Sequence, residues 1–265
     1  MAVKLFIVGL PGSGKSAIAR YIDAYIQRRN RFNPDHRWLT SRYNDYPILY
    51  TMYKDDNEHK RFVHAKPSGF NVIDFKAFDE ALKSLGQWIA WLIISKKIQP
   101  EEIVLIEFAR NNYQIAFRQF DKDFLQDASV IYLGADVKVC KQRISDRALE
   151  QKYPEDNYPV SDYIFETYYH SDDGQLISQI LAQEFGIDGR RVLAFDNNCS
   201  LEEAKKRIIP FIESLINAES VCDQATERSS RYADETPLTE GIDVQENQTT
   251  EPLNSEFSKA TPVLL

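Results

Sequence analysis

A glycine-rich segment near the amino terminus carries the residue types that bind phosphate. Residues 9–16 read Gly-Leu-Pro-Gly-Ser-Gly-Lys-Ser and match the pattern G-x-x-x-x-G-K-[ST] at every fixed position. Glycines let the backbone turn tightly, so that its N–H groups reach phosphate oxygens. Lys15 is expected to reach the β- and γ-phosphates, and the hydroxyl of Ser16 to bind Mg²⁺. The expected nucleotide-binding residues are Gly9, Leu10, Pro11, Gly12, Ser13, Gly14, Lys15 and Ser16.

The residues on either side of this segment support the same interpretation. The apolar run Val3–Val8 is typical of a strand buried on both faces, and a helical pattern runs from Lys15 to about Arg29. A plain glycine turn between strand and helix is the alternative. The strand–loop–helix context favours binding of a nucleoside triphosphate, and we expect ATP with Mg²⁺ as the cofactors.

A second apolar run ends in an acidic residue. Ile103 to Ile106 are followed by Glu107, which we expect at the carboxyl end of a central strand, where open α/β sheets bind their ligands. Glu107 would orient Mg²⁺ or accept a proton from an attacking hydroxyl. Arg110 would contact a phosphate on the donor or on the acceptor. The structural alternatives are a solvent-facing acid and a surface salt bridge. Asp136 is a rival acid, but its position favours a helix cap.

Two arginines follow four residues apart on one predicted helix. Arg143 and Arg147 share a helical face, with Asp146 and Glu150 beside them. They are candidates for catalysis, and an ion-paired helix surface is the alternative.

Taken in order, these motifs resemble the P-loop kinase superfamily, which includes nucleoside-monophosphate, deoxynucleoside, adenylylsulfate and zeta-toxin-like kinases. The shared order is the phosphate loop, an acceptor-binding insert, an acid-ended strand, and "VIYLGA" followed by an R-x-x-x-R helix. The resemblance implies that Arg143 and Arg147 belong to a helical lid of about residues 147–173. The Glu-Arg-Ser triplet of deoxynucleoside kinases and the NKxD guanine selector are both missing, so the subfamily is unassigned.

In this superfamily, the phosphoryl acceptor binds to an insert after the first helix, which here spans about residues 31–74. The segment offers several polar and aromatic side chains, and none of them stands out over a solvated loop. They are Arg42, Tyr43, Asp45, Asp55, Arg61 and Lys66. Near the last predicted strand, Asn197 and Asn198 are candidates to pack against a base. Ser200 and Glu203 form a possible capping box there.

Alternating strand and helix patterns predict an α/β fold of three layers with a parallel sheet. Four strands are expected, at residues 3–8, 102–108, 129–135 and 191–196. Residues 30–70 look irregular. Long helices are expected from Phe75, capped by Asp74, to about Lys97 and from about Asn111 to Leu125. We expect a P-loop kinase-like domain over residues 1–217 and a disordered acidic tail over 218–265.

Composition excludes several classes of protein. The chain has 265 residues, a net charge of −8 and three cysteines without metal-ligand spacing. The acidity disfavours nucleic acid as a partner, and the cysteine usage suits a reducing cytoplasm. Apolar runs are too short to span a membrane. The longest, "WIAWLII" (Trp88–Ile94), fits either the core or the interface of a homodimer.

Together these features predict a P-loop kinase. It would move the γ-phosphoryl group of ATP to a small polar, nucleotide-like acceptor. The alternative is a nucleotide-driven switch or regulatory ATPase that acts on a protein partner.

Overall fold

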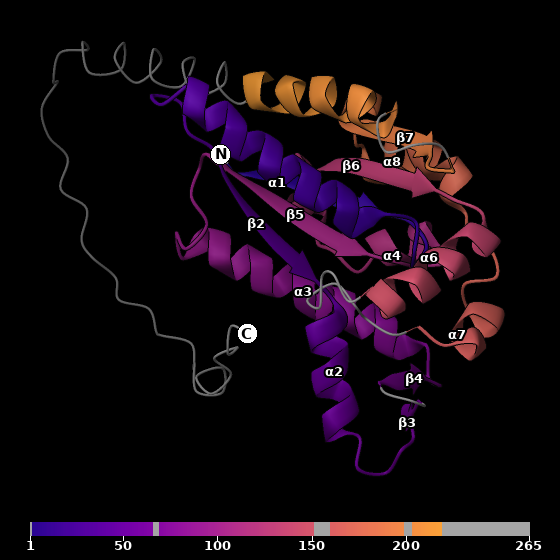
Figure 1. Cartoon of the computed structure of the whole chain (residues 1–265). Helices are drawn as coiled ribbons and strands as arrows, with labels where there is room; N and C mark the ends of the chain where they lie inside the picture. The colour runs from indigo at the N-terminus through magenta and orange to yellow at the C-terminus, as the bar shows by residue number, and fades with distance from the viewer. Residues whose placement is uncertain (1, 66–68, 151–159, 199–202, 219–265) are drawn as a thin grey trace, which may run out of the picture. The chain divides into compact units, whose positions relative to one another are not determined.

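Five parallel strands form the central sheet (Figure 1). The computed structural model describes residues 2–65, 69–150, 160–198 and 203–218. The strands are β1 (Val3–Val8), β2 (Leu39–Asn44), β5 (Glu102–Phe108), β6 (Ser129–Gly134) and β7 (Val192–Asp196). Their order is β2-β5-β1-β6-β7, so β1 lies in the middle, with β5 and β6 on either side. The four strands predicted from the sequence are all present.

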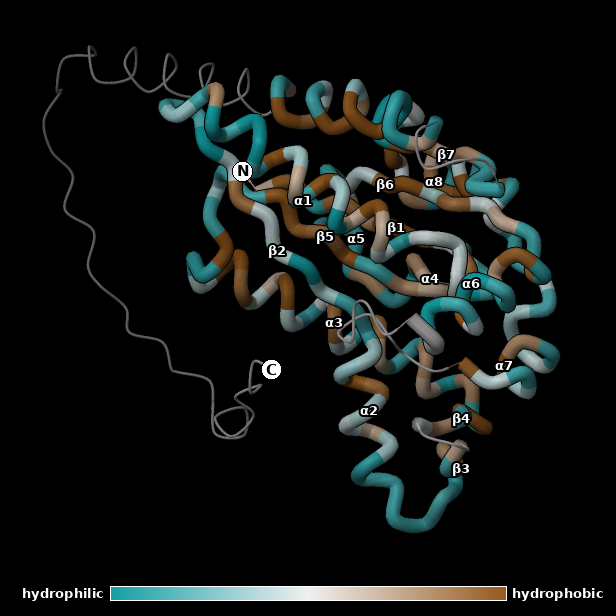
Figure 2. Tube along the Cα trace, in the orientation of Figure 1, coloured by the Kyte–Doolittle hydropathy of each residue, from teal (hydrophilic) through white to brown (hydrophobic). Residues whose placement is uncertain are grey.

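Helices cover both faces of this sheet. α1 (Lys15–Phe32) and a helix over residues 203–218 pack on one face. The other face is covered by α3 (Lys76–Ile94), α4 (Tyr113–Phe117), α5 (Lys122–Leu125) and α8 (Ile177–Phe185). Side chains of β1 alternate between the layers, with Leu5 and Ile7 facing one and Phe6 and Val8 the other. Figure 2 shows the resulting hydrophobic strands at the centre. The predicted three-layer P-loop fold is confirmed.

A smaller group of elements gathers at the carboxyl end of the strands. It contains α2 (Tyr46–Asp55), the hairpin of β3 (Phe62–His64) and β4 (Phe70–Val72), α6 (Val137–Glu150) and α7 (Asp162–Thr167). A third apolar cluster joins these elements to α3, and its members include Leu49, Phe62, Phe78 and Ile164. The insert and the segment around α7 therefore share one core beside the phosphate loop.

The expectation of irregular structure over residues 30–70 is wrong. Strands β2 and β3 and helix α2 lie within that range, and β4 starts at its end. Strand β2 lies at the edge of the sheet and is only partly buried, so its sequence LTSRYN lacks the apolar run of a central strand. Helix α2 has Pro47 in its first turn, a position that tolerates proline.

Two predicted helices also differ from the structure. The single helix expected from Asn111 to Leu125 is two short helices, because Asp121 has extended backbone angles between them. The aromatic rings of Phe117, Phe120 and Phe124 from this segment all pack around Phe6. Helix α3 begins at Lys76, one residue later than expected. Asp74 still accepts a hydrogen bond from the N–H of Lys76 at 3.1 Å.

The apolar run Trp88–Ile94 on α3 divides between core and surface. Ile89 and Leu92 are buried under the sheet, whereas Trp88, Trp91 and Ile94 are 40%, 50% and 81% exposed. The core interpretation therefore holds for one side of the helix, and a homodimer remains a proposal for the other.

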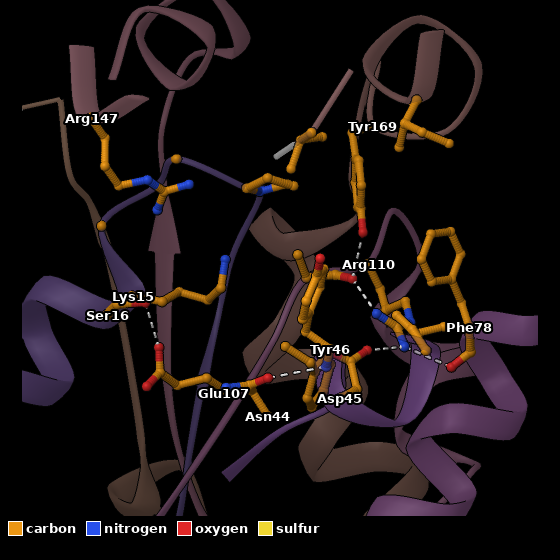
Figure 3. Close-up of a pocket in the computed structure, with 18 of the residues that line it drawn as sticks. Lys15, Ser16, Asn44, Asp45, Tyr46, Phe78, Glu107, Arg110, Arg147 and Tyr169 are labelled. Atoms are coloured by element: carbon orange, nitrogen blue, oxygen red, sulfur yellow. Dashed lines mark hydrogen bonds and ion pairs between the residues drawn. The ribbon is translucent and has the colours of Figure 1, made fainter. Parts of the chain in front are cut away.

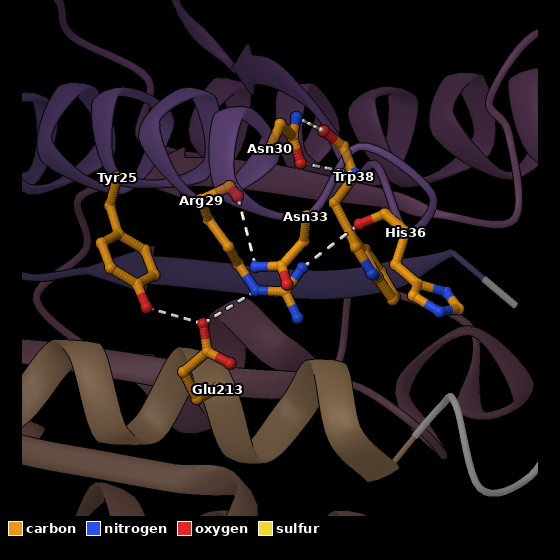
Figure 4. Close-up of polar contacts among 7 residues, drawn as sticks. All are labelled: Tyr25, Arg29, Asn30, Asn33, His36, Trp38 and Glu213. Atoms are coloured by element: carbon orange, nitrogen blue, oxygen red, sulfur yellow. Dashed lines mark hydrogen bonds and ion pairs between the residues drawn. The ribbon is translucent and has the colours of Figure 1, made fainter.

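A polar cluster ties α1 to the helix over residues 203–218 (Figure 4). The carboxylate of Glu213 accepts hydrogen bonds from the hydroxyl of Tyr25 at 2.6 Å and from Nε of Arg29 at 3.0 Å. Nearby, Asn30 exchanges two hydrogen bonds with the backbone of Trp38, which leads into β2. These contacts hold the carboxyl-terminal half of α1 and the segment before β2, whereas the glycine-rich loop lies at the opposite end of α1.

None of the helices in the described part of the chain combines the length and apolar character that a membrane-spanning segment requires.

Candidate nucleotide and acceptor site

The loop Gly9–Ser16 has the conformation that its glycines allow. Gly12 and Gly14 have positive φ angles of 81° and 104°. A Cβ atom on Gly12 would come within 2.3 Å of the carbonyl oxygen of Cys140 on α6, so the loop is also packed too closely for a side chain there. Asn197 supports the loop from behind, since its Nδ2 donates to the carbonyl of Ser13 at 2.6 Å. The backbone is thus shaped as a phosphate cradle.

Lys15 lies across this cradle. Its Nζ donates to the carbonyl oxygens of Gly9 and Leu10, both at 2.9 Å. Burial lowers the pKa of Lys15 from 10.5 to about 8; Glu107 opposes the shift and Arg147 adds to it. Among the described residues, the hydrogen bonds of the Lys15 ammonium group go to neutral carbonyls, so the negative charge of a polyphosphate would stabilise it further.

Glu107 lies at the end of β5, beside the loop (Figure 3). The carboxylate is buried, and its two oxygens have different partners. Oε2 accepts the hydroxyl of Ser16 at 2.9 Å, while Oε1 accepts Nε and an Nη of Arg42 at 3.1 and 2.9 Å. Parallel pairing of β2 with β5 sets this contact, because Arg42 is two residues before the partner of Glu107 in the register. The structure thus brings the predicted pair Ser16 and Glu107 together.

The oxygen ligands present fit a magnesium ion. Mg²⁺ in nucleotide sites takes one or two protein oxygens and fills its shell with phosphate oxygens and water. The Ser16 hydroxyl and the Glu107 carboxylate, at hydrogen-bond distance from each other, form such a pair. No cluster of three or more His, Cys, Asp or Glu side chains occurs in the described ranges. A metal held entirely by protein is therefore not what these residues offer.

Both arginines of α6 line the same cavity as the loop. Arg143 donates from an Nη to the carbonyl of Asn197 at 2.8 Å, and Arg147 points toward Lys15 and Ser16 in Figure 3. The helical spacing thus places Arg143 and Arg147 at one site, as their shared face predicted. Residues 151–159 of the expected lid lie outside the described part of the chain. After them, Val160, which precedes α7, and Ile164 of α7 line the cavity.

Across the cavity from the loop, Arg110 makes a buried ion pair with Asp45. One Nη of Arg110 donates to Oδ2 of Asp45 at 2.5 Å and to the carbonyl of Phe78 at 2.6 Å, while the other donates to its neighbour Ala109 at 2.6 Å. Burial lowers the pKa of Arg110, but the Asp45 carboxylate together with Tyr169 and Tyr168 more than offsets this and raises it above its ordinary value. The ring of Phe78 lies 4.8 Å from the guanidinium carbon. Arg110 is thus held by protein groups and does not face the phosphate loop.

The cavity has a volume of about 330 Å³ and two chemically distinct halves. The phosphate half is formed by five residues of the loop, together with Glu107, Arg143 and Arg147; the five are Pro11, Gly12, Gly14, Lys15 and Ser16. The apolar half consists of Tyr46, Leu49, Phe70, Val72, Phe78, Val160 and Ile164, together with the polar groups of Asp45, Arg110 and Tyr169. In Figure 3 the side chain of Lys15 extends from the phosphate half toward the apolar half.

Several acceptor candidates from the insert lie elsewhere. Tyr43 packs edge-on against Trp88, and Arg61 pairs with Glu80 at 2.8 Å. Asp55 is exposed at the end of α2, and Lys66 falls outside the described residues. Of the set, Asp45 reaches the cavity and Arg42 reaches Glu107.

Two asparagines expected beside a base have other contacts here. Asn197 bonds the phosphate loop, and the side-chain oxygen of Asn198 accepts the N–H of Asp136 at 3.0 Å. Asp136 precedes α6, as expected of a cap position. The capping box at Ser200 lies outside the described residues.

Sequence reasoning missed most of the apolar half. Phe70, Phe78 and Tyr169 come from β4, α3 and the turn after α7, and only the tertiary fold brings them together. One signal was available for Tyr46, which follows Asp45 directly and precedes a proline typical of a helix start.

Comparisons with known proteins find structural similarity only. No protein-family model matches the chain, and no curated protein sequence matches it significantly. The chain is similar to the crystal structure of Chaetomium thermophilum Kti12 in complex with ADP-AlF3, with a TM-score of 0.46 and 15% identity over 80% of this chain and 98% of that one.

Two further solved structures have comparable scores. Mycobacterium tuberculosis APS kinase CysC, in complex with AMPPNP and APS, gives a TM-score of 0.43 and 13% identity over 80% of this chain and 98% of that one. A gluconokinase from Sinorhizobium meliloti gives 0.43 and 12% over 88% and 98%. At these identities the likeness concerns the fold alone, and the subfamily stays unassigned.

Proposed function

We propose that the chain is an ATP-dependent phosphotransferase that moves the γ-phosphoryl group of MgATP to a small molecule. The observation that carries the proposal is the single cavity in which a phosphate cradle faces a separate pocket. A phosphotransferase needs both parts within one solvent-protected space, so that the donor phosphate and the acceptor meet.

Each residue has a role that its position supports. The N–H groups of Gly9–Ser16 and the ammonium of Lys15 would hold the β- and γ-phosphates. Ser16 and Glu107 would hold Mg²⁺, which when bound neutralises phosphate charge. Arg143 and Arg147 would neutralise charge that spreads onto the transferring group. Arg42 would orient Glu107, and Arg110 would orient Asp45 on the acceptor side.

The test is a screen of acceptors with γ-labelled ATP and full-length protein. A new labelled small molecule that appears with the native chain and not with Lys15→Ala supports the proposal. ATP hydrolysis that rises only when a protein extract is added, with no labelled small molecule, would favour the switch or regulatory ATPase instead.

A further inference from the structure

The apolar half of the cavity is more hydrophobic than a site for a sugar or a small acid requires. Seven of its side chains are aliphatic or aromatic, and they come from α2, β4, α3 and the segment around α7. Polyhydroxylated ligands need a hydrogen-bond partner for nearly every hydroxyl, since an unmatched polar group loses its water without compensation. An apolar wall instead stabilises a ligand through the burial of carbon surface.

Aromatic rings along this wall already stack on one another. The rings of Tyr46 and Phe70 lie 5.6 Å apart with an angle of 24° between their planes. Phe70 stacks in turn on Tyr53, at 5.0 Å and 18°. Both Tyr46 and Phe70 line the cavity. Parallel flat rings at its border favour a ligand with a flat ring of its own.

The charges in this half disfavour an anionic ligand. The guanidinium of Arg110 is nearly fully buried and bonded to Asp45, Phe78 and Ala109. Oδ2 of Asp45 is taken by that contact, and within the described residues no hydrogen bond reaches Oδ1. Asp45 can accept a hydrogen bond from a hydroxyl or N–H group, whereas a phosphate or carboxylate group would find no unpaired cation in this half, because Asp45 already offsets the charge of Arg110.

We propose that the phosphoryl acceptor is an uncharged molecule with a flat, largely apolar ring and at least one hydroxyl group. Its ring would lie against Tyr46, Phe70 and Phe78, and a hydroxyl or N–H group would donate to Asp45. The inference rests on the proposed function, and it replaces the wider class of small polar acceptors with neutral ring-bearing alcohols. Nucleosides belong to this class, whereas nucleotides, free sugars and hydroxy acids do not.

Binding is measured by calorimetry with full-length protein saturated with Mg²⁺ and a non-hydrolysable ATP analogue, so that the donor site is filled. The probes are four ribonucleosides, their 5′-monophosphates and free ribose. We expect at least one nucleoside to bind roughly tenfold or more tightly than both its monophosphate and ribose, because ring burial favours it and the apolar half has no unpaired cation to offset the charge of the phosphate. Tighter binding of a monophosphate, equal binding of ribose, or no binding by any nucleoside would overturn the proposal.

Variants of the wall give an independent check. Phe70→Leu keeps apolar volume but removes the flat face, so nucleoside affinity should fall several-fold while affinity for the ATP analogue stays unchanged. Tyr50→Ala is the matched control, since Tyr50 also packs near Phe70 but is 43% exposed and outside the cavity lining. An equal loss in both variants would contradict a direct ring contact. Binding of the ATP analogue in the same samples shows separately whether the phosphate site is functional.

Discussion

The phosphate half and the apolar half of the cavity are built in opposite ways. The phosphate half consists mostly of the backbone of one continuous loop, Gly9–Ser16, with Glu107 and two arginines added. The apolar half consists of side chains from several elements that are distant in the chain, fixed around the buried pair of Asp45 and Arg110. The groups of the phosphate half would suit a charged ligand. In the apolar half the charges of Asp45 and Arg110 offset each other, so we expect specificity there to depend on shape and apolar surface.

Breaking the charge pair of the apolar half should have the largest effect on stability. Asp45→Ala leaves a buried guanidinium without its carboxylate, and we expect a loss of about 3–5 kcal/mol in the free energy of unfolding. Urea denaturation measures it. The matched control is Glu58→Ala, which breaks the exposed pair with Lys60 and should change stability by less than about 1 kcal/mol. Equal losses in the two variants would contradict the structural role of the buried pair.

Removing the cation of the phosphate half should affect chemistry more than stability. In Lys15→Ala the phosphoryl group loses a preorganised positive charge, so we expect the transfer rate to fall about 10²–10³-fold. The measurement is the rate of labelled product formation once an acceptor is known, or of basal ATP hydrolysis before then. Lys83→Ala, on the exposed side of α3, should leave either rate unchanged. A loss of less than threefold in Lys15→Ala would remove this residue from the proposed mechanism.

The pH dependence of nucleotide affinity offers a finer test. The free protein has Lys15 with a pKa of about 8, and a bound polyphosphate favours the charged form. Affinity for MgATP should therefore fall as pH rises above about 8, by up to about tenfold per unit, with proton uptake on binding. Calorimetry in two buffers of different ionisation enthalpy measures that uptake. Lys15→Arg should bind without this pH dependence, and an identical profile in both proteins would assign the titration to another group.

The same shift has a defined sign for the stability of the free protein. Between pH 8 and 10.5 the unfolded chain holds a proton that folded Lys15 has released. The contribution of this group to the free energy of unfolding therefore rises with pH across that window. Below pH 8 the full cost of burying the ammonium is present.

The smallest effect is expected far from both halves of the cavity. Glu213→Gln weakens the contacts with Tyr25 and Arg29 that join α1 to the helix over residues 203–218. We expect a loss of about 1 kcal/mol in the free energy of unfolding, measured by urea denaturation, with nucleotide affinity unchanged. Gln27→Ala on α1 is a suitable control, since the contact of Gln27 with Asp23 is exposed. A change in nucleotide affinity in Glu213→Gln would show that this cluster is coupled to the site.

Features that depend on local backbone chemistry were predictable from the sequence. The phosphate loop follows from glycines at fixed spacing between an apolar run and a helix, and Glu107 from its place after four apolar residues. The spacing of Arg143 and Arg147 was enough to place them on one helix face, and both line the cavity.

Features that depend on tertiary packing could not be predicted from the sequence. Strand β2 is recognisable only once β5 lies beside it, since an edge strand has no continuous apolar run. Arg42 was read as an acceptor contact, yet the register of β2 turns it to Glu107. Arg110, which was expected to contact a phosphate on the donor or the acceptor, is paired with Asp45, 65 positions earlier in the chain. Long-range pairs of this kind leave no periodic signal in one sequence.

Direct titration of the full chain with MgATP by calorimetry tests the central claim, that the loop at Gly9–Ser16 holds a nucleoside triphosphate. The account predicts one site per chain that binds in native protein, with affinity reduced in Lys15→Ala. An absence of binding by MgATP and MgGTP to correctly folded native protein, or equal affinity in Lys15→Ala, would contradict it.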